Sequence, residues 1–148
     1  MTQQEQTLPE VDFRLSLRND IVIIAAEDEQ GHYLLIKHCL RNAGISNEIL
    51  WFEDGKKTLD FFSGDGFDQD GKKYLLLLDI RMPGIDGIEV LENIKKDEAL
   101  AHIPVIMLTT SEDHELAARC YSLGCEAHIV KPPGVTLLKA IKRICERL

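Results

Sequence analysis

Asp79 ends an unbroken apolar run, Tyr74–Leu78, and a turn-forming Pro-Gly sequence follows it closely. A carboxylate buried at the end of such a run is costly unless a cation or a hydrogen-bond donor pairs with it. Other apolar runs of the chain also end in side chains that could reach this carboxylate. These side chains are Glu27, Asp28, Thr109 and Lys131.

The types of these residues point to phosphoryl transfer. A cluster of carboxylates repels itself and must bind a cation or take up protons, and Mg²⁺ prefers carboxylate, water and phosphate oxygens. A lysine is a compact positive charge suited to phosphoryl oxygens, and a threonine hydroxyl can donate one hydrogen bond to the same group. Asp79 could itself be the nucleophile that accepts the phosphoryl group. The reaction needs mainly positioning and neutralisation of charge, which this set of residues supplies.

The pattern of apolar residues places these side chains on a common scaffold. Short apolar runs alternate with segments in which apolar residues recur every three or four positions, which is typical of alternating strands and helices. Continuous apolar strands between amphipathic helices predict an α/β fold with a parallel sheet covered on both faces. Ligands bind outside the carboxyl ends of such strands. The strands are predicted at Ile21–Ala26, Glu48–Phe52, Tyr74–Leu78, Val105–Leu108 and Ala127–Val130.

Helical periodicity predicts which side of a helix faces the sheet. In the first helix the predicted core face contains Leu35, Ile36, Cys39, Leu40 and Ala43, and Gly44 ends the helix. In the last helix the predicted core face contains Val135, Leu138, Ile141, Ile144, Cys145 and Leu148.

The composition limits the class of protein. The 148 residues are 45% hydrophobic and 28% charged, which suits one globular domain. A formal net charge of −8 argues against nucleic-acid binding, and no apolar run approaches the roughly 18 residues that a membrane span needs. Residues 1–19 are polar and lack periodicity, so we expect an arm or a short extra helix, part of it disordered, and no signal peptide. Four cysteines without a CxxC pair are expected to stay reduced in the cytoplasm.

Taken together, the motifs resemble the receiver domains of two-component response regulators. The resemblance covers residues 20–148, and each of its motifs follows a predicted strand. The motifs are the acidic pair Glu27-Asp28, LLDIRMPGIDG around Asp79, Thr109-Thr110, and VKPP at residues 130–133. The resemblance implies a flavodoxin-like, doubly wound (βα)5 fold with strand order 2-1-3-4-5, and no output domain. The chain looks most similar to stand-alone regulators, in particular those partnered with phytochrome-type histidine kinases.

By position, the resemblance assigns a role to each side chain of the site. Asp79 would be the phosphoacceptor, and Lys131 would contact the phosphoryl oxygens, with a cis bond between Lys131 and Pro132. Thr109 would be the switch hydroxyl that turns toward the phosphate. The protein ligands of Mg²⁺ would be Asp28, Asp79 and the backbone carbonyl of Arg81, with Glu27 also holding the metal, directly or through water.

Two positions differ from the commonest pattern of the family. His128 stands where a switch Tyr or Phe usually lies. The resemblance therefore implies that the switch residue of this chain is a histidine, whose ring is polar and can take up a proton. Thr110 stands where Ala or Gly is frequent. Because Thr110 is bulkier, we expect it to hinder the access of water or of a phosphatase to the phosphate.

The leading hypothesis is a single-domain response regulator that catalyses only its own phosphorylation and dephosphorylation. A sensor histidine kinase or a phosphotransfer protein would supply the phosphoryl group, and a changed surface around the last two strands would bind a downstream target. The alternative is a degenerate receiver that acts as a scaffold without phosphorylation, against which the intact Asp79, Thr109 and Lys131 argue. An aspartyl phosphatase of the haloacid dehalogenase type would need an acid at position 81, where the chain has Arg81. The sequence leaves monomer and homodimer equally open.

Overall fold

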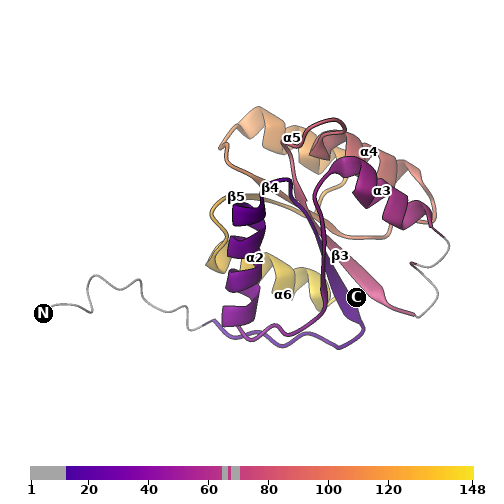
Figure 1. Cartoon of the computed structure of the whole chain (residues 1–148). Helices are drawn as coiled ribbons and strands as arrows, with labels where there is room; N and C mark the ends of the chain where they lie inside the picture. The colour runs from indigo at the N-terminus through magenta and orange to yellow at the C-terminus, as the bar shows by residue number, and fades with distance from the viewer. Residues whose placement is uncertain (1–12, 65–66, 68–70) are drawn as a thin grey trace, which may run out of the picture.

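The computed structural model describes residues 13–64, 67 and 71–148, which form five successive β–α units (Figure 1). All five predicted strands are present, with bounds that differ from the prediction by at most one residue at either end. β3 and β4 each extend one residue further at the carboxyl end, so that Asp79 and Thr109 belong to strands. The strands are β1 (Ile21–Ala26), β2 (Ile49–Phe52), β3 (Lys73–Asp79), β4 (Val105–Thr109) and β5 (Ala127–Val130). The helices are α2 (Gln30–Asn42), α3 (Gly55–Ser63), α4 (Gly87–Lys96), α5 (His114–Leu123) and α6 (Val135–Cys145).

The five strands form one parallel sheet in the order β2-β1-β3-β4-β5. This order confirms the flavodoxin-like, doubly wound fold, in which the chain reverses direction across the sheet between β1 and β3. Every residue of β1 and β4 is buried, and so is every residue of β3 except Lys73. These strands read as unbroken apolar runs because helices cover both faces of the sheet.

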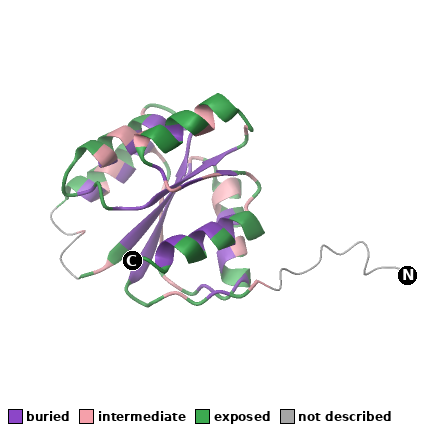
Figure 2. Cartoon of the chain, turned by 180° about the vertical axis from the view of Figure 1, so that it is seen from behind, coloured by how far each residue is buried: buried purple, intermediate pink, exposed green. Residues whose placement is uncertain are grey.

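Two apolar cores lie on opposite faces of the sheet. Alternate strand residues enter different cores, so that Leu75 and Leu77 pack in one and Leu76 and Leu78 in the other. Helices α2 and α6 cover the first core, and α3, α4 and α5 cover the second (Figure 1). Seen from behind, the strands are buried between helices whose outward faces are exposed (Figure 2).

The predicted core faces of the helices are mostly confirmed, with two corrections. Ile36, Leu40 and Ala43 of the first helical segment are buried, and so are Leu138, Ile141, Ile144 and Cys145 of α6. Leu35 was wrongly placed in the core, since it is 50% exposed, and Val135 is 37% exposed. The buried stripe of α2 runs through Ile36, Leu40 and Ala43, and Leu35 lies about 100° around the helix from Ile36. Leu35 therefore lies beside this buried stripe, where it lines a groove together with Pro132 and Pro133 of the loop that follows β5.

The beginning of the chain packs against the first core from residue 13 onward. Residues 1–12 of the predicted arm, and part of the predicted loop before β3, lie outside the described residues. Leu15 is buried, and its N–H donates to the carbonyl oxygen of Ala43 over 2.9 Å. Within the described ranges no helix is both long and apolar enough to cross a membrane, and all four cysteines are free.

Candidate functional site

The carboxyl ends of four neighbouring strands bring the predicted residues to one edge of the sheet. Glu27 follows β1, Asp79 ends β3, Thr109 ends β4 and Lys131 follows β5. The parallel register sets these ends level with one another, because it pairs Ala26 with Leu78, Asp79 with Leu108, and Thr109 with Val130. Glu27, Asp79 and Thr109 are buried, and the Lys131 side chain is only 7% exposed.

Asp79 is a buried carboxyl group whose charge is only partly balanced. The Nζ atom of Lys131 lies 3.2 Å from its Oδ1 atom. Burial raises the pKa of Asp79, the negative charge of Glu27 raises it further, and the nearby Lys131 lowers it, which leaves a pKa of about 7. The deprotonated form of Asp79 would therefore gain from a second positive charge at the site.

Glu27 is fully buried, and both its carboxylate oxygens and its backbone carbonyl oxygen accept hydrogen bonds. Its Oε1 atom lies 2.5 Å from Nζ of Lys131, and its Oε2 atom accepts from the N–H of Glu29 over 3.2 Å. The indole N–H of Trp51 donates to the carbonyl oxygen of Glu27 over 2.7 Å. Trp51 in turn stacks on Tyr33, with ring centroids 4.6 Å apart and an interplanar angle of 3°. This stack, which joins β2 to α2, holds the end of β1 in place.

Three carboxylates of the site fit a hard divalent cation. Glu27, Asp28 and Asp79 each offer an oxygen atom, and these atoms lie within 4.8 Å of one another. Such a set is typical of an Mg²⁺ site. The raised pKa of Asp79 indicates that a bound cation would stabilise its deprotonated form. Arg81 is exposed after β3 and lines, with Asp28, a groove of about 620 Å³. A ligand role for the carbonyl of Arg81 stays a prediction.

The two predicted switch residues lie on β4 and β5. Thr109 is buried, and its Oγ1 atom accepts from the N–H of Ser111 over 3.1 Å. His128 is half-buried, and its N–H donates to the hydroxyl of Tyr121 over 3.1 Å. The Nε2 atom of His128 is buried without a hydrogen-bond partner among the described residues. The structure thus places His128 on β5, outside the acidic cluster, and its switch role stays a prediction.

The turn after β3 positions Asp79 through its backbone. A Cβ atom on Gly87 would come within 2.2 Å of the carbonyl oxygen of Asp79, so this position has no room for a side chain. The N–H of Gly87 donates to the carbonyl oxygen of Ile80 over 2.8 Å. Asp86 begins α4 by accepting from the N–H of Glu89 over 2.9 Å. The PGIDG sequence thereby turns the chain tightly beneath the candidate phosphoacceptor.

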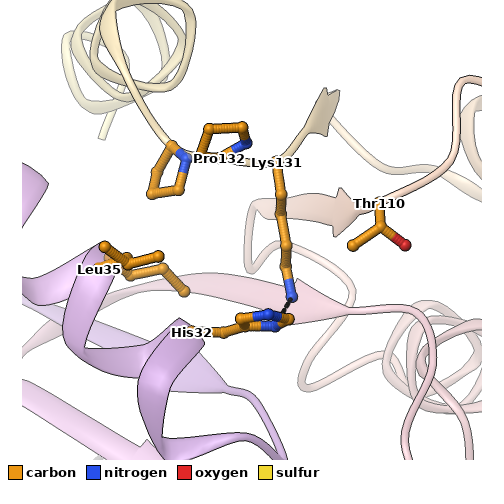
Figure 3. Close-up of a pocket in the computed structure, with 7 residues that line it drawn as sticks. His32, Leu35, Thr110, Lys131 and Pro132 are labelled. Atoms are coloured by element: carbon orange, nitrogen blue, oxygen red, sulfur yellow. Dashed lines mark hydrogen bonds between the residues drawn. The ribbon is translucent and has the colours of Figure 1, made fainter.

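A groove of about 230 Å³ opens beside Lys131, between α2 and the loop that follows β5 (Figure 3). Its lining includes His32 and Leu35 from α2, Thr110 after β4, and Pro132. The peptide bond between Lys131 and Pro132 is cis, as the sequence predicted. Lys131 extends from the end of β5 and reaches His32, where Nζ lies 3.1 Å from Nδ1 of the ring (Figure 3).

Two residues of the site were not identified from the sequence. No role in the site was predicted for Trp51, yet its indole N–H anchors the backbone of Glu27. His32 was not singled out, yet it contacts Lys131. Two features of the sequence could have identified these residues. Trp51 lies near the end of the strand beside β1, and His32 follows the acidic residues by one helical turn.

The fold and this edge of the sheet define a receiver domain of a response regulator. Residues 23–142 match the response regulator receiver domain, and since this is most of the chain, the protein belongs to that family. Members of this family are signalling proteins that histidine kinases or phosphotransfer proteins phosphorylate.

One relative and two solved structures show which members of the family this chain is similar to. The probable methanogenesis regulatory protein FilR2 of Methanothrix harundinacea is 35% identical over 125 residues, which are 84% of this chain and 81% of FilR2. The bacteriophytochrome response regulator AtBRR is 35% identical and superposes with a TM-score of 0.71, covering 81% of this chain and 89% of AtBRR. The Mn²⁺-bound form of response regulator Rcp1 is 30% identical with a TM-score of 0.67, covering 83% of this chain and 90% of Rcp1. The predicted resemblance to receiver domains of the phytochrome-associated type is confirmed at this level.

Proposed function

We propose that this receiver domain is a phosphorylation switch in which Asp79 is the phosphoacceptor and Mg²⁺ is the cofactor. The observation that carries the proposal is the burial of Asp79 beside Glu27, Asp28 and Lys131 at the carboxyl edge of the sheet. The phosphoryl group comes from a histidine of a sensor kinase or a phosphotransfer protein. The relation to the bacteriophytochrome response regulator AtBRR favours a phytochrome-type kinase as the source.

The residues of the site divide the transfer between them. A carboxylate oxygen of Asp79 forms a bond to phosphorus while the bond from phosphorus to the donor's imidazole nitrogen breaks, and the imidazole takes up a proton. Lys131 neutralises negative charge on the phosphoryl oxygens. The positive charge that Mg²⁺ supplies when bound by Glu27, Asp28 and Asp79 offsets the remaining negative charge. Attack of water on the phosphorus later breaks the bond to Asp79, restores its carboxylate and releases inorganic phosphate.

The proposed output is a rearrangement of β4, β5 and their helices. Phosphate oxygens would attract the Thr109 hydroxyl away from its bond with Ser111. The half-buried ring of His128 could then move, and its buried Nε2 atom could gain a partner. A change of this kind would alter the exposed surface at Tyr121, whose hydroxyl accepts from the N–H of His128.

The rival interpretation is a scaffold that does not depend on phosphorylation. A scaffold has no need of a buried carboxyl group with a raised pKa. A chain with an apolar side chain at that position would avoid the cost of burying the charge. Fluorine NMR with beryllofluoride, a phosphoryl mimic, tests the two directly. We expect a bound species that disappears in EDTA and in Asp79→Asn. Binding that is equal with and without Mg²⁺, or no binding at all, would favour the scaffold.

A further inference from the structure

The ammonium group of Lys131 has a third neighbour besides the two carboxylates. Its Nζ atom lies 2.5 Å from Oε1 of Glu27, 3.2 Å from Oδ1 of Asp79 and 3.1 Å from Nδ1 of His32. Figure 3 shows the lysine side chain crossing from the end of β5 to the ring of His32 on α2. The three contacts approach from β1, β3 and α2, so they hold the ammonium group from different directions.

The number and kind of these contacts match the chemistry of an ammonium group. A lysine has three N–H donors and no acceptor, so Nδ1 of His32 must accept and the ring proton lies on Nε2. The side chain of Lys131 is only 7% exposed, and an unpaired donor there would be costly. A neutral imidazole supplies the third acceptor without adding negative charge to a site that already contains three carboxylates.

The same geometry argues against a second metal site at this point. Glu27, Glu29 and His32 could in principle hold an ion, since each has a donor atom within 4.8 Å of the others. The ammonium group of Lys131 already occupies the space between Glu27 and His32. Glu29, whose Oε2 atom is 3.3 Å from Nδ1, is a largely exposed carboxylate. The cation of this cluster is therefore Lys131 itself.

We propose that His32 is a positioning residue for Lys131. By accepting the third N–H, His32 fixes the ammonium group in one position beside Glu27 and Asp79. The fixed ammonium group in turn holds these two carboxylates in the geometry that would bind Mg²⁺, and it stays aimed at the place where phosphoryl oxygens would lie. The consequence for phosphorylation rests on the proposed function, but the position of Lys131 does not.

Two substitutions at position 32 separate the acceptor from the bulk of the side chain. His32→Asn keeps an acceptor, because its Oδ1 atom lies near the place of Nδ1, and His32→Leu removes the acceptor while keeping comparable size. His38→Leu is the matched control, since His38 is an exposed histidine on the same helix. All three variants are compared with the unmodified chain for folding by circular dichroism.

The first measurement observes Lys131 without any phosphorylation. In ¹⁵N-lysine NMR an ammonium group with three acceptors exchanges its protons slowly, and the signal of Lys131 is assigned by its loss in Lys131→Met. We expect this signal in the unmodified chain, His38→Leu and His32→Asn, and its broadening in His32→Leu. By calorimetry, the Kd for Mg²⁺ should rise about tenfold in His32→Leu alone, as is usual when a group that orients a metal site is lost.

The second measurement is phosphorylation by acetyl phosphate at saturating Mg²⁺. The maximal rate should fall about tenfold in His32→Leu, with the half-saturating donor concentration unchanged, and His32→Asn should recover most of the rate. If the NMR signal and the Kd for Mg²⁺ are the same in His32→Leu as in the unmodified chain, the inference is wrong. It is equally wrong if His32→Asn and His32→Leu lose the signal alike. If no variant and not even the unmodified chain is phosphorylated while the NMR and calorimetric effects occur, the proposed function fails and the positioning role stands.

Discussion

Gly87 packs directly against the main chain of Asp79, and a Cβ atom at Gly87 would lie 2.2 Å from the carbonyl oxygen of Asp79. A further atom of the backbone, Cα of Ile80, would lie 2.8 Å away. Neither neighbour is the flexible end of a side chain, so the clash can be relieved only if the backbone moves at the end of β3 or at the start of α4. The candidate phosphoacceptor is thus positioned by a residue that has no side chain.

The first prediction concerns this contact. Gly87→Ala should lower the free energy of unfolding by about 1–3 kcal/mol, as overpacking usually does, and should reduce phosphorylation because Asp79 is displaced. Gly31→Ala is the matched control, since nothing lies within 4 Å of a Cβ there. It should be neutral or stabilising by up to about 1 kcal/mol, because alanine favours the helix. Urea denaturation measures both, and equal effects of the two substitutions would contradict the packing argument.

A second prediction concerns the charge of Asp79 when metal is removed. Asp79→Asn should raise Tm in EDTA at pH 8, because it removes a buried carboxylate that burial and Glu27 disfavour. Each kcal/mol of relief corresponds to about 2–4 °C. Mg²⁺ at 100 times its Kd should stabilise the unmodified chain by about 2.7 kcal/mol and the variant far less. A fall in Tm of Asp79→Asn in EDTA would show that Asp79 is stabilising without metal.

A third prediction uses the single tryptophan of the chain. The indole N–H of Trp51 binds the carbonyl of Glu27, so its emission should change when Mg²⁺ or beryllofluoride binds next to Glu27. Trp51→Phe keeps an aromatic ring against Tyr33 but loses the N–H donor. We expect its Kd for Mg²⁺ to rise about tenfold by calorimetry, the lower end of the usual effect of such supporting groups. An unchanged Kd would mean that the bond does not hold Glu27 in position.

A fourth prediction concerns the lifetime of the phosphoryl group. Thr110 is exposed and lines the groove beside Lys131. Thr110→Gly should shorten the half-life of the phosphorylated protein, because a smaller residue admits water to the phosphorus. Thr136→Gly, at an exposed threonine of α6, serves as the control. The half-life follows from the decay of the phosphorylated band on a phosphate-affinity gel, and a longer half-life in Thr110→Gly would refute the shielding role.

A fifth prediction concerns the dependence of stability on pH. Burial lowers the pKa of His128, and the charge of Asp113 opposes this effect more weakly. A base whose pKa is lowered in the folded state contributes stability above its unfolded pKa of about 6.5, and this contribution is lost as the pH falls below that value. His128→Phe should therefore lose less stability between pH 7 and pH 5 than the unmodified chain does. An unchanged slope in His128→Phe would contradict the burial effect.

The pattern of apolar and polar residues was enough to predict the fold class and the candidate phosphoacceptor. Strands buried on both faces must be apolar along their whole length, so each strand is visible as a run, and the helices between them are visible by their period. Because the carboxyl ends of parallel strands share one edge, the polar residues after the runs had to meet there. For Asp79, Glu27 and Lys131 the structure agrees with this expectation.

Which atoms of these residues touch, and which further residues support them, became visible only in the folded chain. Lys131 is separated by 104 positions from Glu27 and by 99 from His32, and no local periodicity records a contact of that range. Sequence periodicity also misplaced Leu35. Its neighbour Ile36 is buried in the core, but Leu35 points about 100° away around the helix and lines the groove beside Lys131. The bond from Trp51 to Glu27 depends on how β2 and α2 pack at the sheet edge. The direction of a side chain follows from the packing of whole elements, and that packing is settled only when the chain has folded.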